Sequence, residues 1–323
     1  MSTTLQDRFV NTLLGAAVGD ALGVPHEFSE RELFYISPVI GMCFDGAHRQ
    51  PIGTWSDDTA MIWATVDVLT QHLKSGEALP SESLYKNMIL AFLEWFQKAK
   101  YTPHGEVFDI GNTVSGVLRD YAITPDFARQ PLVLQGAEDN WSQGNGSLMR
   151  FLPVALWHAV APWSKEDLAK CSAITHAHPV VVDACLHYAD VFRFSLHYGF
   201  EKAIQLASHC AKKRKASYVP ELKVIQARKE YEVYSTGYVK HTLEAAYWCI
   251  LAGGSYQDCV LRAVNLGGDT DTIASITGGL CAWLGHVPPT EWLDCLARIK
   301  PLESAYSAYG RCLQKVCKQI MRP

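Results

Sequence analysis

The chain of 323 residues has 29 lysine and arginine residues, 33 acidic residues, a formal net charge of −4 and a hydrophobic content of 48%. This content supplies a large buried core, which excludes disordered and fibrous proteins. The weak negative charge argues against nucleic acids and membranes as partners.

In chain order, apolar residues recur at spacings of three and four, as on one face of a helix. The pattern predicts helices over residues 9–22, 61–69, 84–96, 181–194, 243–251 and 273–284. Strand-like alternation is scarce. Its best candidate is residues 34–44, where a small hairpin and a plain loop are equally consistent with the sequence. Residues 128–145 predict a long loop. We therefore expect an all-α fold with residues 1–323 in one compact domain.

The ten cysteines include no pair at C-x-x-C spacing, and most lie in apolar helix-like runs. Disulfide frameworks normally belong to short, loop-rich secreted chains, so we expect buried free thiols in a reducing cytosol. The sequence has no signal-like segment and no apolar run long enough for a membrane span. These observations predict a soluble cytoplasmic protein.

Two acidic clusters stand far apart in the sequence, each just before an apolar helical run. Residues 53–59 read GTWSDDT, and residues 267–272 read GGDTDT. Taken singly, each is equally well explained as a helix N-cap, with Ser56 or Asp57 capping one helix and Asp269 the other. Taken together, they supply more carboxylates and hydroxyls than capping requires. Hard oxygen ligands in this number suit Mg²⁺ or Mn²⁺, whereas Zn²⁺ more typically takes Cys or His.

The small residues at 15–23, GAAVGDALG, predict that the first helix packs closely against another backbone. Glu27 follows the glycine and proline that end this helix. It can serve as a general acid or base in a cleft, although this segment alone favours an exposed loop glutamate.

Three further segments give weaker signals. The segment FDIGNT spans residues 108–113, and the glycine-rich segment GNGSLMR spans residues 144–150. Free N–H groups of the second segment can hold a phosphate or ribose, although a plain turn is the usual explanation. The segment THAHP at 175–179 is better explained by capping or core histidines than by metal ligands.

Together these segments resemble the ADP-ribosylglycohydrolase family, in order along nearly the whole chain. The motifs are GDALG at 19–23, SDDT at 56–59, GNGSLMR at 144–150, GYV at 237–239 with TLEAA at 242–246, and GDTDT at 268–272. Their order is strong evidence, whereas any one motif would be weak. The resemblance implies an all-α domain whose central cleft holds two Mg²⁺ or Mn²⁺ ions.

The resemblance also implies roles for residues that match the motifs. The implied metal ligands are Ser56, Asp57, Asp58, Asp269, Asp271 and Thr272; the family usually has Thr at position 56, and a serine hydroxyl can also coordinate. The implied catalytic acids are Glu27, beside the distal ribose, and Asp109, near the scissile bond. The implied substrate-binding residues are Asn112, Asn145, Gly146, Ser147, His176 and Tyr238. Residues 145–147 would hold the pyrophosphate, and Tyr238 would lie near the adenosine.

The implied activity is hydrolysis at C1″ of an ADP-ribosylated protein, with release of free ADP-ribose. Glu27 or Asp109 would assist proton transfer, and carboxylates would stabilise oxocarbenium-like charge. The motifs at 108–113 and 237–246 favour N-linked ADP-ribosyl-arginine over O-linked serine. The partners implied are the modified protein and, in an immunity role, an ADP-ribosyltransferase toxin. Reversal of a regulatory modification is the alternative setting, and we expect a monomer.

The sequence leaves two alternatives to this hypothesis. The motif at 269–272 resembles the Asp-x-Asp-x-Thr of haloacid-dehalogenase-type phosphatases, but there it must follow a strand of a parallel sheet, and here it follows a helical run. The second alternative is a catalytically inactive ADP-ribose binder or structural relative. All six implied ligand positions retain oxygen-bearing side chains, and both implied acids are present, so the sequence favours an active hydrolase.

Overall fold

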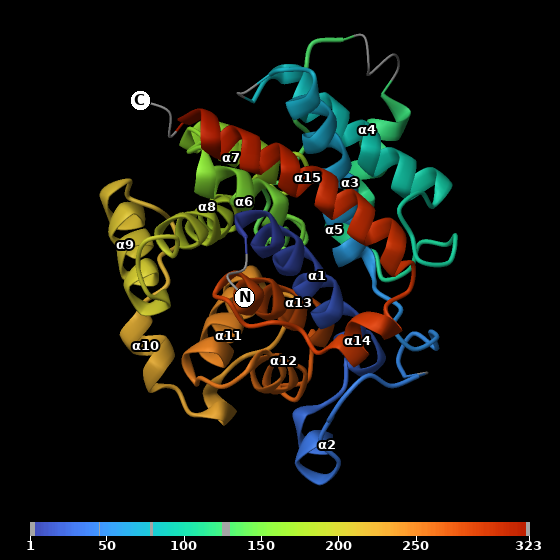
Figure 1. Cartoon of the computed structure of the whole chain (residues 1–323), viewed down its shortest axis with the longest axis vertical. Helices are drawn as coiled ribbons and strands as arrows, with labels where there is room; N and C mark the ends of the chain where they lie inside the picture. Colours follow the sequence, from blue (N-terminus) through green and yellow to red (C-terminus); the bar gives the residue numbers. More distant parts are fainter. Residues whose placement is uncertain (1–3, 45, 78–79, 125–129, 321–323) are drawn as a thin grey trace.

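The helices α1, Leu5–Gly23, and α13, Thr270–Trp283, lie side by side at the centre of the molecule (Figure 1). Their backbones touch because small residues face each other across the contact. A Cβ added to Gly19 would lie 2.0 Å from the carbonyl oxygen of Ala274, and one added to Gly15 would lie 2.7 Å from that of Gly278. Only glycine allows so close an approach. The predicted close packing of the first helix is therefore confirmed.

The computed structural model describes residues 4–44, 46–77, 80–124 and 130–320. Within these ranges it has no β-strand, and its only pairing of that kind is two isolated bridges. The remaining helices are η1 Val24–His26, α2 Arg31–Ile36, α3 Asp57–Lys74, α4 Glu82–Lys98, α5 Asn112–Ile123, α6 Leu152–Val160, α7 Lys165–Ala173, α8 Pro179–Phe194, α9 Phe200–Lys213, α10 Leu222–Ala227, η3 Glu230–Glu232, α11 Val239–Leu251, α12 Tyr256–Val264, α14 Thr290–Cys295 and α15 Ile299–Ile320. The all-α prediction is confirmed, and each predicted helix is present.

The other helices surround the central pair. Helix α15 lies across α1 and α3, while α11 and α12 pack against α13 (Figure 1). The core is apolar and contains large side chains that are fully buried, such as Trp55, Trp157 and Trp283. No described helix combines the length and the hydropathy that a membrane span requires.

The possible hairpin over residues 34–44 is wrong. Helix α2 takes the first part of this segment, and residues 37–44 have no regular structure. Phe34 is buried, and its ring packs edge-on against that of His26. This apolar residue therefore belongs to the buried face of a short helix and not to a strand. The predicted loop at 128–145 begins outside the described residues, and its described part, 130–145, contains no helix.

Candidate active site

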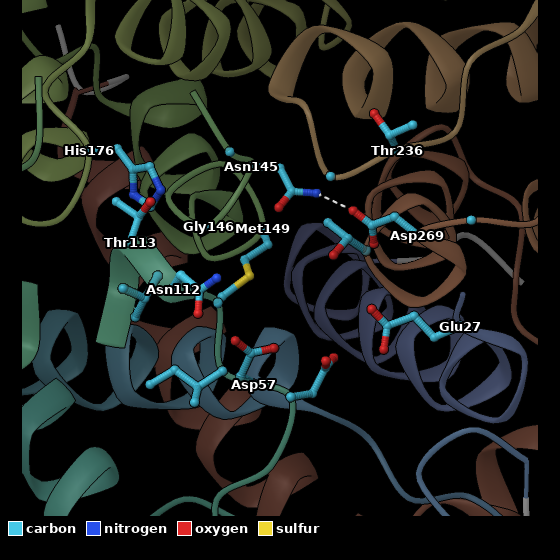
Figure 2. Close-up of a pocket in the computed structure, with 18 of the residues that line it drawn as sticks. Glu27, Asp57, Asn112, Thr113, Asn145, Gly146, Met149, His176, Thr236 and Asp269 are labelled. Carbon is cyan, nitrogen blue, oxygen red and sulfur yellow. Dashed lines mark hydrogen bonds between the residues drawn. The ribbon is translucent and has the colours of Figure 1, made fainter. Parts of the chain in front are cut away.

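A cavity of about 580 Å³ opens beside the start of α3 and α13. Its lining includes the carboxyl groups of Glu27, Asp57, Asp109 and Asp269. Figure 2 shows Glu27, Asp57 and Asp269 around one side of the opening, and His176 on the other. The cavity thus has an acidic end and a neutral, glycine-rich end. The rest of its lining includes Phe28, Asn112, Thr113, Gly144, Asn145, Gly146, Met149, Thr236, Gly237 and Thr272.

The acidic end is formed by two helix N-termini that meet. Asp57 and Asp58 open α3 after the cap Ser56, and the α13 cap Asp269 begins the other cluster. The hydroxyl of Thr272 on α13 donates a 3.2 Å hydrogen bond to Oδ2 of Asp58 on α3. Negative groups are stabilised at helix N-termini, so this junction partly offsets the crowding of acids.

The start of α3 is fixed to α1 by the buried side chain of Asp20. Its carboxylate accepts hydrogen bonds from the backbone N–H groups of Ser56, at 2.9 Å, and Thr59, at 3.0 Å. It also accepts a 2.6 Å bond from the Thr59 hydroxyl. The capping interpretation holds for Ser56, whose hydroxyl accepts the N–H of Asp58, but the Asp269 side chain makes no capping bond.

Several acidic oxygens at this junction are buried without a donor. Among the described residues, Oδ1 of Asp58 and both carboxylate oxygens of Asp271 have no hydrogen-bond partner. A buried ionised carboxylate without a partner is costly. Unpaired oxygens from two facing clusters are the donor set that a hard divalent cation takes. The residues present therefore fit a divalent metal site.

The acids raise one another's proton affinity. Burial, with the nearby charge of Asp109, raises the pKa of Asp57 well above its ordinary value. Burial, with the charge of Asp20, does the same for Asp58, and burial with the charge of Glu27 does so for Asp271. Such groups stay ionised together only when positive charge neutralises them.

Glu27 and Asp109 lie at the outer side of the junction. Carboxylate oxygens of Glu27, Asp269 and Asp271 fall within 4.8 Å of one another. Burial, with the charge of Asp269, raises the pKa of Glu27 to about 8. Burial, with the charge of Glu27, raises the pKa of Asp109 to about 7. Both groups can therefore exchange a proton near neutral pH.

Asp109 adopts an unusual backbone conformation. Its φ is 59°, in the left-handed region, and it stands just before α5. Non-glycine residues in this region carry strain, which often accompanies functional positions. The turn directs the Asp109 side chain into the cavity lining.

The glycine-rich segment forms the wall next to Asp269. The Asn145 backbone N–H donates to the carbonyl of Gly237 at 3.0 Å, and Gly144 and Tyr238 form an isolated bridge. At Gly146, an added Cβ would lie 2.8 Å from Val114 and 2.9 Å from the His176 ring. Glycine is therefore required where this segment passes the ring.

His176 is a neutral imidazole at the cavity wall. Burial, reinforced by the charge of Arg150, lowers its pKa to about 3. Its Nδ1 lies 3.0 Å from the Thr175 hydroxyl, which accepts a 2.8 Å hydrogen bond from Arg150. His178, two residues on, caps α8 instead and accepts the Val180 N–H.

A family model described as ADP-ribosylglycohydrolase matches residues 1–321. The chain belongs to this family. It is 30% identical, over 90% of its length and 74% of the relative's, to the ADP-ribosylarginine hydrolase Tri1 of Pseudomonas putida (strain GB-1). It is 26% identical, over 91% of both chains, to the ADP-ribosyl-[dinitrogen reductase] glycohydrolase of Rhodospirillum rubrum.

The fold is also that of a solved family structure. A chain titled ADP-ribosylglycohydrolase-related protein complex superposes with a TM-score of 0.73 at 27% identity, covering 96% of this chain and 99% of that one. The phosphatase alternative is excluded, because Asp269 follows α12 and a Gly-Gly turn rather than a strand.

The structure brings most of the expected ADP-ribosylglycohydrolase residues to one place. Of the six expected ligands, Asp57, Asp269 and Thr272 line the cavity, while the others lie buried beside it. Glu27, Asp109, Asn112, Asn145, Gly146 and His176 also line the cavity.

Two expected substrate contacts lie elsewhere. The Ser147 side chain is fully buried, and its hydroxyl lies 2.9 Å from that of Ser172. The Tyr238 hydroxyl donates to Gln143 at 3.4 Å, and its ring packs edge-on against His241. Neither residue is part of the cavity lining, whereas Gly237, next to Tyr238, is.

Two residues that hold the site together, Asp20 and His48, carry no predicted site role. Asp20 had a usable signal, because it is an acid within the small-residue stretch of the first helix. His48, which contacts both Glu27 and Asp109, lies in a segment without a recognisable motif.

Proposed function

We propose that this protein is a metal-dependent hydrolase that removes ADP-ribose from modified arginine side chains. Membership of the glycohydrolase family and the printed names of two relatives support this activity. The observation that carries it is the pair of helix N-termini that place buried, unpaired carboxylate oxygens at one end of a cavity. The cavity is large enough for a nucleotide-sized ligand.

In this proposal, two Mg²⁺ or Mn²⁺ ions are held by six side chains. They are Ser56, Asp57 and Asp58 from the start of α3, with Asp269, Asp271 and Thr272 from the start of α13. Bound cations would supply Lewis acidity and neutralise the crowded carboxylates. The remaining chemistry belongs to the chain itself.

The neutral end of the cavity would bind the rest of ADP-ribose. Gly146 and His176 line this end of the cavity, where the neutral His176 imidazole would offer a phosphate or ribose a hydrogen bond without charge. Asn112 at the start of α5 lies across the opening. The reactive ribose would then face the acids.

Glu27 and Asp109 would carry the proton transfers. Their pKa values of about 8 and about 7 suit groups that give and accept protons near neutrality. Cleavage at C1″ develops oxocarbenium-like positive charge, and the surrounding carboxylates would stabilise it. The products are free ADP-ribose and the unmodified arginine.

The biological setting is either reversal of a regulatory modification or protection against an ADP-ribosylating toxin. A relative named as acting on dinitrogen reductase supports the first, and both settings require a modified protein as the substrate. An immunity role would add a toxin as a direct partner.

The deciding experiment measures release of free ADP-ribose from arginine-ADP-ribosylated and serine-ADP-ribosylated proteins, with Mg²⁺, Mn²⁺ or EDTA. We expect metal-dependent release from arginine that Asp269→Ala abolishes. The matched control is Asp258→Ala, which removes an exposed aspartate from the first turn of α12. Binding of ADP-ribose without release from any linkage would instead identify an inactive binder.

A further inference from the structure

The His48 imidazole touches both acids proposed for proton transfer. Its Nε2 is hydrogen-bonded to Oε2 of Glu27 and lies 3.7 Å from Oδ1 of Asp109. The three residues come from three separate segments of the chain. Among the described residues, no other imidazole or cationic side chain forms an ion pair with either acid.

The turn that carries His48 is fixed in place rather than free at the surface. The Ala47 N–H donates a 3.1 Å hydrogen bond to the carbonyl of Pro25, two residues before Glu27. Gly46 has a φ of +80°, and a Cβ there would lie 2.0 Å from the same carbonyl oxygen. The turn therefore sits directly against the segment that ends in Glu27.

Aromatic rings hold the imidazole from the sides. The ring centroid of Phe108 lies 5.4 Å from that of His48, and the centroid of Phe28 lies 6.1 Å away. Each aromatic residue is adjacent in sequence to one of the two acids, Asp109 and Glu27. The His48 side chain is consequently only 17% exposed.

We propose that His48 is a positioning residue that donates its Nε2–H to Glu27 and so fixes this carboxylate toward the metal-site aspartates. Glu27 is the connecting group, because it clusters with His48 and Asp109 on one side and with Asp269 and Asp271 on the other. When bound cations keep Glu27 ionised, its carboxylate has no proton to give, so the shared hydrogen belongs to Nε2 of His48. One oxygen is thereby held and the other is left for the reaction.

The position of His48 distinguishes this role from a catalytic one. His48 does not belong to the cavity lining, whereas Glu27 and Asp109 do. It thus acts behind the two acids and reaches the substrate only through them. Loss of an outer hydrogen-bond partner of this kind typically lowers activity about 10- to 100-fold.

The test rests on the proposed function and uses the full-length chain. We expect His48→Ala to lower kcat about 10- to 100-fold while KM and Mn²⁺ affinity stay within about twofold. His48→Gln places an amide N–H near the position of Nε2 and should restore most of the loss, as should added imidazole with the alanine variant. His209→Ala, an exposed histidine on α9, is the control and should match wild type.

A readout without turnover separates the two proposals. Ring ¹⁵N–¹H spectra should show a slowly exchanging Nε2–H of His48 that disappears in Glu27→Ala. Unchanged kcat in His48→Ala, or loss of Mn²⁺ affinity in step with kcat, would overturn the positioning role. A wild-type protein that hydrolyses nothing would reject the proposed function, while the spectra would still decide whether His48 binds Glu27.

Discussion

The side-chain amide of Asn145 donates a 2.6 Å hydrogen bond to Oδ2 of Asp269 (Figure 2). The same amide also donates to the Thr242 hydroxyl at 2.9 Å. Asn145 therefore ties the glycine-rich wall to the first acid of the second cluster. Its amide fixes the orientation of a carboxylate that has no capping bond of its own.

Loss of this bond should weaken the metal site. We expect Asn145→Ala to reduce Mn²⁺ affinity about 10- to 100-fold, because partners that orient a ligand typically contribute this much. Isothermal titration calorimetry of the metal-free protein with Mn²⁺ measures this affinity. Asn140→Ala, which alters an exposed side chain of the same loop, is the control. Equal affinities in the two variants would contradict a role for Asn145 in orienting Asp269.

Replacing Asp20 by asparagine should destabilise the fold. The carboxylate accepts two backbone N–H groups and one hydroxyl of the segment Ser56–Thr59 at full burial. An amide keeps one acceptor and turns an NH₂ group toward donors, leaving buried groups unpaired at a cost of about 1–3 kcal/mol. Urea denaturation of the metal-free protein would measure the loss. Asp120→Asn on the exposed face of α5 should leave stability unchanged.

The helix contact between α1 and α13 gives a third prediction. Gly19→Ala would place a Cβ 2.0 Å from the carbonyl oxygen of Ala274. We expect a loss of about 3 kcal/mol or more, or failure to fold, since overpacking at a backbone contact cannot relax by moving a side chain. Gly116→Ala in α5 is the matched control: nothing lies within 4 Å of its added Cβ. The control should gain about 0.5–1 kcal/mol.

Without a cation, stability should fall as pH rises. Burial, as the largest cause, raises the pKa of Asp20 to about 6, of Asp109 to about 7 and of Glu27 to about 8. Carboxyl groups with a raised folded pKa stabilise the fold below their unfolded pKa of about 4, and this contribution is lost as pH passes the folded values. Cations that bind the ionised groups should reverse the loss.

Thermal melts with EDTA and with Mn²⁺ test this dependence. We expect Tm in EDTA to be lower at about pH 8 than at about pH 5, and the gain in Tm from Mn²⁺ to be larger at the higher pH. The Asp269→Ala variant, tested in parallel, should show little gain in Tm from Mn²⁺ at either pH. The same gain at both pH values in the wild type would contradict the coupling between carboxyl ionisation and cation binding.

The parts of the site that the sequence predicts are those encoded locally. The acids of both clusters directly precede apolar helical runs, so their place at helix N-termini follows from neighbouring residues. The close contact of α1 with α13 likewise follows from the four-residue spacing of Gly15, Gly19 and Gly23. Helical periodicity extends over many residues, and burial of the apolar face reinforces it.

Other parts depend on tertiary placement and leave no local pattern. His48 reaches the acids because its turn rests on Pro25, a contact between residues with no shared periodicity. Ser147 and Tyr238 belong to motif segments, but neither is part of the cavity lining, and their hydroxyls bond to Ser172 and Gln143 instead. A motif identifies a segment near the site, whereas the direction of each side chain is set by packing.

The two acidic clusters lie on helices that are far apart in the sequence and meet beside the central α1–α13 pair. The acids of α3 are made before those of α13, and about two hundred residues of chain separate the two groups. Contacts between residues this distant in sequence form slowly, because a long loop must close first. The two acidic clusters can therefore meet only after α13 has been made, when α1 and α3 are already present to pack against it.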